Sequence, residues 1–514
     1  MRYRELNRAF SRLRAILRSL CDKASFPVEL LSGSAYSVIG SVVLRLAQVC
    51  GAVFLARMLT QSDFGQVSLV QSTLTVFISV GAMGGGAMGT RMVAERRVTG
   101  GRGLGSAIAL SSILSTTGGL LSSAIVFCAA ASLSRDVSRG GELTPLIQIG
   151  AAYILFYALS DAAMGVLRGF QDFRPIAVSQ AVQAVVLIAA YGILVPLWKA
   201  KGAVAALALG VAVCALVAGL CVRRGWVSGA AEFRWRDLRP DLPMVWHFGI
   251  PTMLSGIISA PAVWMVNATL ARSSRGYAAV ALLNAGNAVR MLLLFVPLLV
   301  GQAAFPFAMD AIKRDSARFA RYMRFTHNLI TLPLHAGSLV MLYLAGPLML
   351  VFGKSYGHGS ETLAWLLLSV AVQAFGSTSG IALQCSRLLW MGFLMNGVWA
   401  LGLVFTTRAL VEPMGAPAAA MGYVLGFAAL VGGQTWLLRK WLPAGMARLT
   451  IFGVLLDLGV AGVWVAAGGP ETAWGRVAAA VALVGTYFLR ARRAPEHDKE
   501  RDLAAALKCE GEAA

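Results

Sequence analysis

Polar residues recur at helical spacing within an apolar stretch near the start of the chain, at residues 34–57. The members of this stripe are Ser34, Ser37, Ser41, Arg45 and Gln48. Intervals of three or four residues place such side chains on one face of a helix. Because lipid offers no hydrogen-bond partner, we expect that face to turn toward a cavity. Arg45 then suits an anionic ligand, since a guanidinium keeps its charge and donates paired hydrogen bonds to phosphate.

A second cationic group stands in the other half of the chain, in the apolar stretch at 277–304. Asn284, Asn287 and Arg290 share one side of the helix expected there. An ionisable group inside a span costs about 2.5–3.5 kcal/mol on insertion scales, so each arginine needs an explanation. The predicted substrate-binding cavity consists of Ser41, Arg45, Gln48, Asn284, Asn287 and Arg290. The alternative is that each arginine pairs within its own half or reaches the membrane surface.

Five further ionisable groups lie inside or at the ends of apolar stretches. Asp161 and Arg168 are seven residues apart, on one helix face and about 10 Å apart along its axis. They form either a site for a coupling cation or proton, or a structural pair. Asp457 is interpreted as structural and His335 as a core residue. Arg57, near the end of its stretch, is expected to reach the membrane surface.

These residues need spans to position them, and a helix that crosses a bilayer requires about 20 mainly apolar residues. Fourteen stretches meet this requirement, at 34–57, 66–90, 104–131, 146–168, 176–198, 202–222, 248–270, 277–304, 325–352, 361–384, 389–411, 414–437, 449–468 and 473–490. The fold class is therefore an all-α polytopic membrane protein with about 14 transmembrane helices. Five glycines between 81 and 89 favour close helix packing at the end of the second span, with a hinge as the alternative.

The composition agrees with a membrane protein and excludes a cytosolic enzyme. Of 514 residues, 57% are hydrophobic and only 13% are charged, and the mean hydropathy is +0.70. The net charge of +21 alone would also suit a nucleic-acid-binding protein. However, 33 of the 45 Lys and Arg residues lie in alternate loops and the two ends, against 9 in the opposite loops. This bias predicts that both termini are cytoplasmic.

No cofactor, metal site or disulfide framework is indicated. The seven cysteines form no CxxC pair, and the five histidines form no HxxxH or HExxH cluster. The chain also lacks a Walker motif, so ATP is not expected to drive it directly. The basic segment at 1–33 is predicted to be an amphipathic arm on the inner leaflet, or alternatively a solvated arm.

Two pairs of short motifs indicate an internal repeat. LTQSDFG at Leu59–Gly65 corresponds to LARSSRG at Leu270–Gly276, and LRGFQDF at Leu167–Phe173 to LQCSRLL at Leu383–Leu389. With an even number of spans per half, the copies run parallel, and such bundles bind substrate between lobes that rock. The predicted divisions are a basic arm at 1–33, six-helix lobes at 34–222 and 248–437, a cytoplasmic linker at 223–247, two additional helices at 438–490, and a cytoplasmic tail at 491–514.

Three stretches resemble the polysaccharide and O-antigen flippase family of the multidrug/oligosaccharidyl-lipid/polysaccharide exporter superfamily. They are FLARMLTQSDFGQVSLVQS (Phe54–Ser72), GTRMVAERR (Gly89–Arg97) and HFGIPTMLS (His247–Ser255). The resemblance implies a flippase of the bacterial inner membrane that translocates undecaprenyl-pyrophosphate-linked oligosaccharide repeat units for O-antigen, capsule or exopolysaccharide biosynthesis. It implies a monomeric transport unit in the lipid bilayer, with a polysaccharide polymerase and a chain-length regulator as partners.

Three alternatives remain open. A peptidoglycan lipid-precursor flippase carries a similar anionic lipid. A cation-coupled multidrug exporter of the same superfamily would need acids in the cavity, where the first span offers Arg45. A membrane glycosyltransferase or polymerase usually needs a long external loop, whereas the longest outside loop here, Ser132–Pro145, is short. The sequence therefore favours a transporter over an enzyme.

Overall fold

The computed structural model describes residues 28–98, 103–137, 142–228, 241–246, 257–314, 316–385, 389–440, 442–443, 445–470 and 472–491. Within these ranges the regular elements are helices and no strand is present. The all-α fold class is confirmed. Residues 1–27 of the basic arm, the motif at His247–Ser255 and the tail after Ala491 lie outside the described residues.

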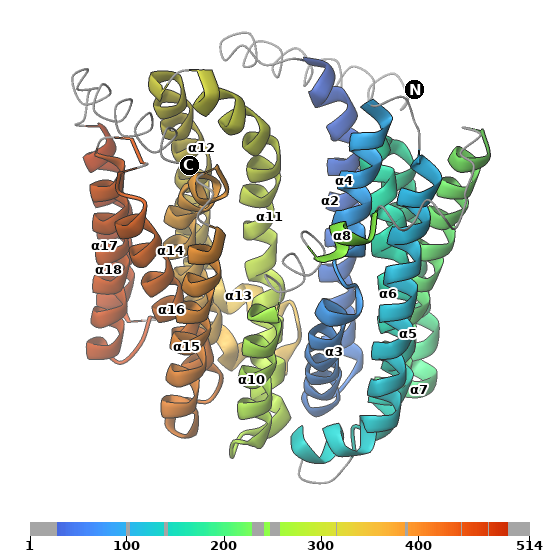
Figure 1. Ribbon diagram of the computed structural model, residues 1–514. Coiled ribbons are helices and arrows are strands. Elements are labelled where there is room, and N and C mark those ends of the chain that lie inside the picture. Colours follow the sequence, from blue (N-terminus) through green and yellow to red (C-terminus); the bar gives the residue numbers. More distant parts are fainter. Residues whose placement is uncertain are drawn as a thin grey trace, which may run out of the picture.

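The helices of the N-terminal half form one bundle, coloured blue to green on the right of Figure 1. They are α2 (Val28–Met58), α3 (Gln61–Gly81), α4 (Gly85–Val98), α5 (Leu104–Val137), α6 (Thr144–Phe170) and α7 (Phe173–Ser228). Helix α2 packs along α7, and α6 packs between α5 and α7. The short α8 (Leu242–Met244) follows and lies against this bundle, where Asp241 pairs with Arg96 of α4.

The C-terminal half forms a second bundle, on the left of Figure 1. Its elements are α10 (Ser259–Arg272), α11 (Gly276–Arg314), α12 (Ser316–Tyr343), α13 (Ala345–Leu350), the 3-10 helix η3 (Lys354–Gly359), α14 (Ser360–Cys385), α15 (Leu389–Met414) and α16 (Ala416–Leu437). The two additional helices, α17 (Met446–Ala467) and α18 (Ala473–Ala491), pack against the outer side of this bundle (Figure 1). The lengths and apolar faces of these helices account for the fourteen expected spans, with two local differences.

The first difference is a break in the second expected span. Met83 and Gly84 have positive φ angles of 47° and 67°, which separate α3 from α4. Directly after the break, Gly86 packs against the backbone of Gly165 on α6, and Thr90 Oγ1 donates to both carbonyls at 2.9 Å. The glycine-rich segment therefore provides close packing and also interrupts the helix.

The second difference lies in the ninth expected span, 325–352, which is divided at Leu344 between α12 and α13. The fifth and sixth expected spans both lie within α7, which turns back on itself at Lys199, where φ is 48° and ψ is −125°, so that Gly202 packs against the carbonyl oxygen of Leu194. Within the described residues, ten helical stretches are long and apolar enough to cross a membrane by length and composition. Large apolar side chains on their outer surfaces are exposed, including Val185 at 70% and Phe405 at 76%. Such surfaces are typical of helices that face lipid.

Candidate functional site

The three predicted site residues of the first bundle lie together on α2. Arg45 Nη1 donates to Gln48 Oε1 at 3.1 Å, and Ser41 Oγ donates to Oε1 of Gln180 on α7 at 3.3 Å. The Arg45 side chain is partly exposed, and no acidic side chain of the described residues pairs with it. The stripe therefore carries a positive charge that an amide, rather than a carboxylate, accompanies.

This stripe does not lie on the most exposed side of α2. Leu46, which is 51% exposed, is about 100° around the helix from Arg45. Ala56, about three turns beyond Arg45 on nearly the same face, is only 5% exposed. The polar face therefore runs from the partly exposed Arg45 toward a buried contact at the C-terminal end of the helix.

Arg290 lies in a different environment, inside the second bundle. Its side chain is 2% exposed, and it donates to Ser369 Oγ at 3.2 Å and to Gln373 Oε1 at 3.0 Å, both on α14. On its own helix it donates to Asn287 Oδ1 at 3.2 Å. Asn284 Nδ2 donates to Oδ1 of Asn267 on α10 at 3.0 Å. The three predicted residues of α11 thus belong to a polar network within their own bundle.

Aromatic rings complete the surroundings of Arg290. Its guanidinium carbon lies 4.6 Å from the ring centre of Tyr423 and 5.3 Å from that of Phe427, both on α16. Ring faces and neutral dipoles stabilise a buried cation that has no acidic partner among the described residues. These contacts all lie within the second bundle. The structure therefore does not bring Arg290 together with Arg45 in one cluster.

Asp161 and Arg168 form an ion pair on α6. Arg168 Nη2 lies 3.4 Å from Asp161 Oδ1, and the two side chains are 47% and 31% exposed. Asp161 also packs against Gly86, so a Cβ atom at Gly86 would overlap its carboxylate. The pair therefore lies directly beside the break between α3 and α4.

Contacts between the two bundles gather where α2 ends and α3 begins. Arg57 Nε donates to the carbonyl oxygen of Val351 at 2.8 Å, and Gln61 Nε2 donates to that of Ser355 at 2.6 Å. Further along α3, Thr73 Oγ1 accepts from Trp264 Nε1 on α10 at 3.1 Å. In Figure 1 the bundles lie close together at this end and diverge toward the end where α2 begins.

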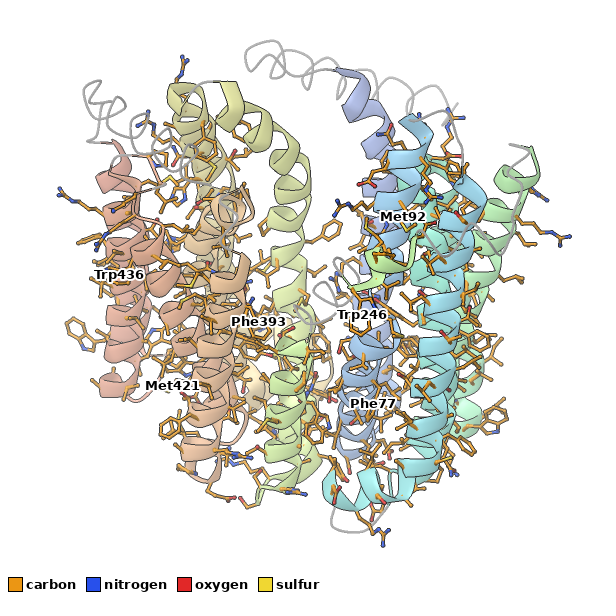
Figure 2. The ribbon with its side chains drawn as sticks, in the orientation of Figure 1. Phe77, Met92, Trp246, Phe393, Met421 and Trp436 are labelled. Carbon is orange, nitrogen blue, oxygen red and sulfur yellow. The ribbon has the colours of Figure 1, made fainter. Side chains whose placement is uncertain are left out.

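Sequence reasoning missed this contact. Arg57 was expected to extend to the membrane surface, but its guanidinium instead binds a carbonyl of the opposite bundle. The available clue was its position beside the repeated LTQSDFG motif, which forms the turn between α2 and α3. Trp246 is a second residue that sequence reasoning did not select. It is 73% exposed and follows two residues after the end of α8 (Figure 2).

The fold thus consists of two bundles of helices, many of them long enough to span a membrane, that meet at one end. Solved structures share this fold. A multidrug resistance MATE family transporter of the MOP superfamily, in an inward-facing conformation, has a TM-score of 0.68 and 17% identity over 82% of this chain and 99% of its own. The lipid II flippase MurJ, in an inward closed conformation, has a TM-score of 0.63 and 12% identity over 88% and 97% of the two chains.

The chain belongs to the polysaccharide biosynthesis protein family, whose model matches residues 30–311. It is also similar to the EPS I polysaccharide export inner membrane protein EpsE of Ralstonia nicotianae (strain ATCC BAA-1114 / GMI1000). The two are 24% identical over 431 residues, which cover 80% of this chain and 94% of the relative. The family resemblance is confirmed, and the protein is a multi-pass membrane transporter of the polysaccharide-export type. Its family and structural neighbours are transporters and flippases rather than enzymes.

Proposed function

We propose that this protein is a flippase that moves undecaprenyl-pyrophosphate-linked oligosaccharide repeat units across the bacterial inner membrane by alternating access. The product would serve surface polysaccharide biosynthesis, together with a polymerase and a chain-length regulator. The single observation that carries the proposal is Arg45, a partly exposed guanidinium with an amide partner and no acidic one among the described residues. The family match and the similarity to a polysaccharide export protein support a glycan cargo.

The strength of an arginine–phosphate contact suits transport. A pair of unit charges 4 Å apart gains about 4 kcal/mol at an effective dielectric constant of 20, before desolvation is subtracted. When phosphate approaches Arg45, the guanidinium exchanges a charge-assisted hydrogen bond to the neutral Gln48 amide for a stronger one to an anion. The site would therefore draw an anionic headgroup from the membrane surface and still release it.

The two arginines have different proposed roles. Arg45 contacts the pyrophosphate, with Ser41 and Gln48 beside it on α2. Arg290 is surrounded by side chains of its own bundle, so we assign it a fixed positive charge that attracts the substrate without touching it in this conformation. Asn284 and Asn287 hold that arginine and its helix in place.

The distribution of basic residues supports cytoplasmic termini. With that orientation, we can assign each end of the structure to one side of the membrane. The end of the molecule held by Arg57 and Gln61 then faces outward, and the end at which the bundles diverge faces the cytoplasm. The conformation would be ready to accept substrate from the inner leaflet. Trp246, exposed just after α8, would offer an aromatic face to a sugar ring.

Two alternatives differ in cargo. A peptidoglycan lipid precursor carries the same kind of anionic headgroup, and the likeness to MurJ makes it the second candidate. A cationic drug, as the fold shared with a MATE transporter suggests, would be repelled by Arg45. The absence of a described carboxylate beside Arg45 therefore favours an anionic cargo.

Reconstitution into lipid vesicles tests the proposal. Fluorescent polyprenyl-pyrophosphate oligosaccharide, fluorescent peptidoglycan precursor and a cationic dye are offered in parallel, and transfer between leaflets is measured by quenching. We expect the oligosaccharide to move fastest, Arg45→Ala to slow it at least tenfold, and Arg45→Lys to restore it only partly because the planar fork is lost. Arg91→Ala, which removes an exposed arginine paired with Glu95, is the matched control. Unchanged transfer by Arg45→Ala would show that this arginine is structural.

A further inference from the structure

A buried imidazole and a buried carboxylate join the second bundle to the additional helix α17. His335 Nε2 on α12 lies 3.2 Å from Asp457 Oδ1, and the two side chains are 4% and 1% exposed. Sequence reasoning treated these residues separately, one as core and one as structural. Their contact places two ionisable groups face to face at the junction between α12 and α17.

The surroundings of this pair are apolar. The ring of Phe375, on α14, lies edge-on to His335 with the ring centres 5.5 Å apart. The same ring packs so closely against Gly453, one turn before Asp457 on α17, that a Cβ atom there would overlap it. Trp464, two turns after Asp457, packs edge-on against Trp365 of α14 at 5.0 Å. These rings keep bulk water away from the carboxylate.

Asp457 has one oxygen without a hydrogen-bond partner. Oδ1 faces the imidazole, whereas Oδ2 is fully buried and has no partner among the described residues. A buried carboxylate oxygen without a donor is costly, because burial removes its water and nothing replaces it. This orphaned oxygen points to a ligand that attaches to the carboxyl group itself.

Among the described residues, no second ion pair to this carboxylate is found. Besides the pair itself, the helices packed around it carry described arginine, histidine, tyrosine and glutamate side chains, namely Tyr277 and Arg290 on α11, Arg321, Tyr322, Arg324, His327 and Tyr343 on α12, Glu361 on α14, Tyr423 on α16, Arg448 on α17 and Arg476 on α18. His327 Nδ1 bonds to Thr378 at 2.8 Å, and Arg290 bonds to the opposite side of α14 and to Tyr423. At the level of Asp457, α18 contributes the buried Ala479 and Ala482.

The charge balance of the pair then determines how many protons it holds. With one titratable proton, the pair is neutral overall, either as carboxylic acid and imidazole or as carboxylate and imidazolium. Loss of that proton leaves a net negative charge in an apolar site, and gain of another leaves a net positive charge. Burying an uncompensated charge is strongly unfavourable, so the one-proton state is preferred over a wide pH range.

We propose that His335 and Asp457 form a proton-binding site that holds one proton at the junction between α12 and α17. The proton leaves only when the junction loosens, because departure places an uncompensated carboxylate between Phe375 and α17. The additional helices thereby contribute a proton site to the protein and do more than extend its membrane surface. This inference goes beyond the proposed function and requires no substrate.

The test is thermal unfolding of the purified protein in lipid nanodiscs as a function of pH. Above neutral pH the native pair retains a proton that the unfolded chain has released, so stability falls as pH rises. One such proton lowers the folding equilibrium constant about tenfold per pH unit. We expect Asp457→Asn to remove this component of the pH dependence and the matched control Asp172→Asn, which changes an exposed carboxylate, to leave it unchanged. Equal pH dependence in the wild type and Asp457→Asn overturns the proposal.

If Asp457→Asn does not accumulate, a second variant still tests whether the pair binds a proton. In His335→Gln the imidazole is replaced by a neutral amide, so the proton must stay on Asp457, and infrared spectra should show the carbonyl stretch of a protonated carboxyl group at neutral pH. A carboxylate spectrum alone contradicts the proposal. Sodium chloride replaces potassium chloride at constant pH in a parallel series, and a sodium-dependent shift that equals the proton-dependent one would reassign the site to a metal cation.

Discussion

The variant Arg290→Ala tests whether Arg290 has a structural role, in contrast to the substrate-contacting role proposed for Arg45. In the native protein, Arg290 donates three hydrogen bonds to neutral groups, at 3.0–3.2 Å, and lies over two aromatic rings. Alanine leaves Asn287 and Gln373 without their donor, at a cost of about 1–3 kcal/mol for each buried group that stays unsatisfied. It also removes a desolvated cation–π contact of about 2 kcal/mol.

An opposing contribution limits the loss. Removing the guanidinium also removes the desolvation penalty of a buried charge, which amounts to several kcal/mol. The cavity left by the side chain then adds to the destabilisation. We expect a net loss of about 3 kcal/mol for Arg290→Ala. Arg290→Met, which keeps most of the volume, should lose about 1 kcal/mol, because isosteric apolar replacement of buried charge is often tolerated.

Thermal unfolding in nanodiscs and the vesicle transfer assay measure the two consequences separately. Arg290→Ala should melt several degrees below the wild type, whereas Arg45→Ala should melt close to it because its guanidinium is partly exposed. Arg290→Met should fold well and still transfer substrate slowly if the fixed charge attracts the headgroup. A melting temperature of Arg290→Ala equal to that of the wild type would refute the reasoning from burial. Normal transfer by Arg290→Met would remove the charge from the mechanism.

The remaining predictions concern the contact between bundles and the break in the second span. Arg57→Ala removes the hydrogen bond to Val351, which contributes roughly 1 kcal/mol, and should therefore raise the fraction of molecules open at that end about fivefold. Distances between spin labels on the two bundles measure this fraction. An unchanged distance distribution contradicts the prediction. Gly86→Ala should lower stability by about 1–3 kcal/mol because its Cβ overlaps Asp161, so normal unfolding would show that the helices separate easily. The Asp161→Asn variant should keep most of the transport activity if the pair with Arg168 is structural. If transport by this variant no longer depends on an ion gradient, Asp161 is instead a coupling site.

The fold was largely predictable because apolar length and charge distribution define membrane spans. The helices begin and end close to the expected limits over most of the described chain. The break at Met83 was not predictable from periodicity. Directly after it, Gly86 approaches Gly165, which is 79 residues away in the sequence. The glycine-rich composition revealed that something unusual occurs there, but not which helix lies opposite.

The candidate site was predictable in part, for a related reason. Spacing placed Ser41, Arg45 and Gln48 on one helix face, and in the structure Arg45 contacts Gln48 whereas Ser41 contacts Gln180 of α7. Spacing also placed Asn287 beside Arg290. It could not show which neighbour that second face meets, since the answer depends on how α11 packs against α14 and α16. A helical pattern therefore predicts which residues share a helix face, but it does not predict which neighbouring helices that face contacts.

The chemistry of the bundle contact bears on how the transporter changes state. Arg57 and Gln61 bind backbone carbonyl oxygens rather than carboxylates, and both bonds are in exposed positions. Water replaces such bonds readily, so each contributes about 1 kcal/mol. Breaking these two bonds therefore costs about 2 kcal/mol, which is less than the roughly 4 kcal/mol of one arginine–phosphate contact before desolvation. A set of buried ion pairs at the same place would cost more than that contact supplies. The neutral acceptors opposite Arg57 and Gln61 therefore suit a contact that must open in every transport cycle.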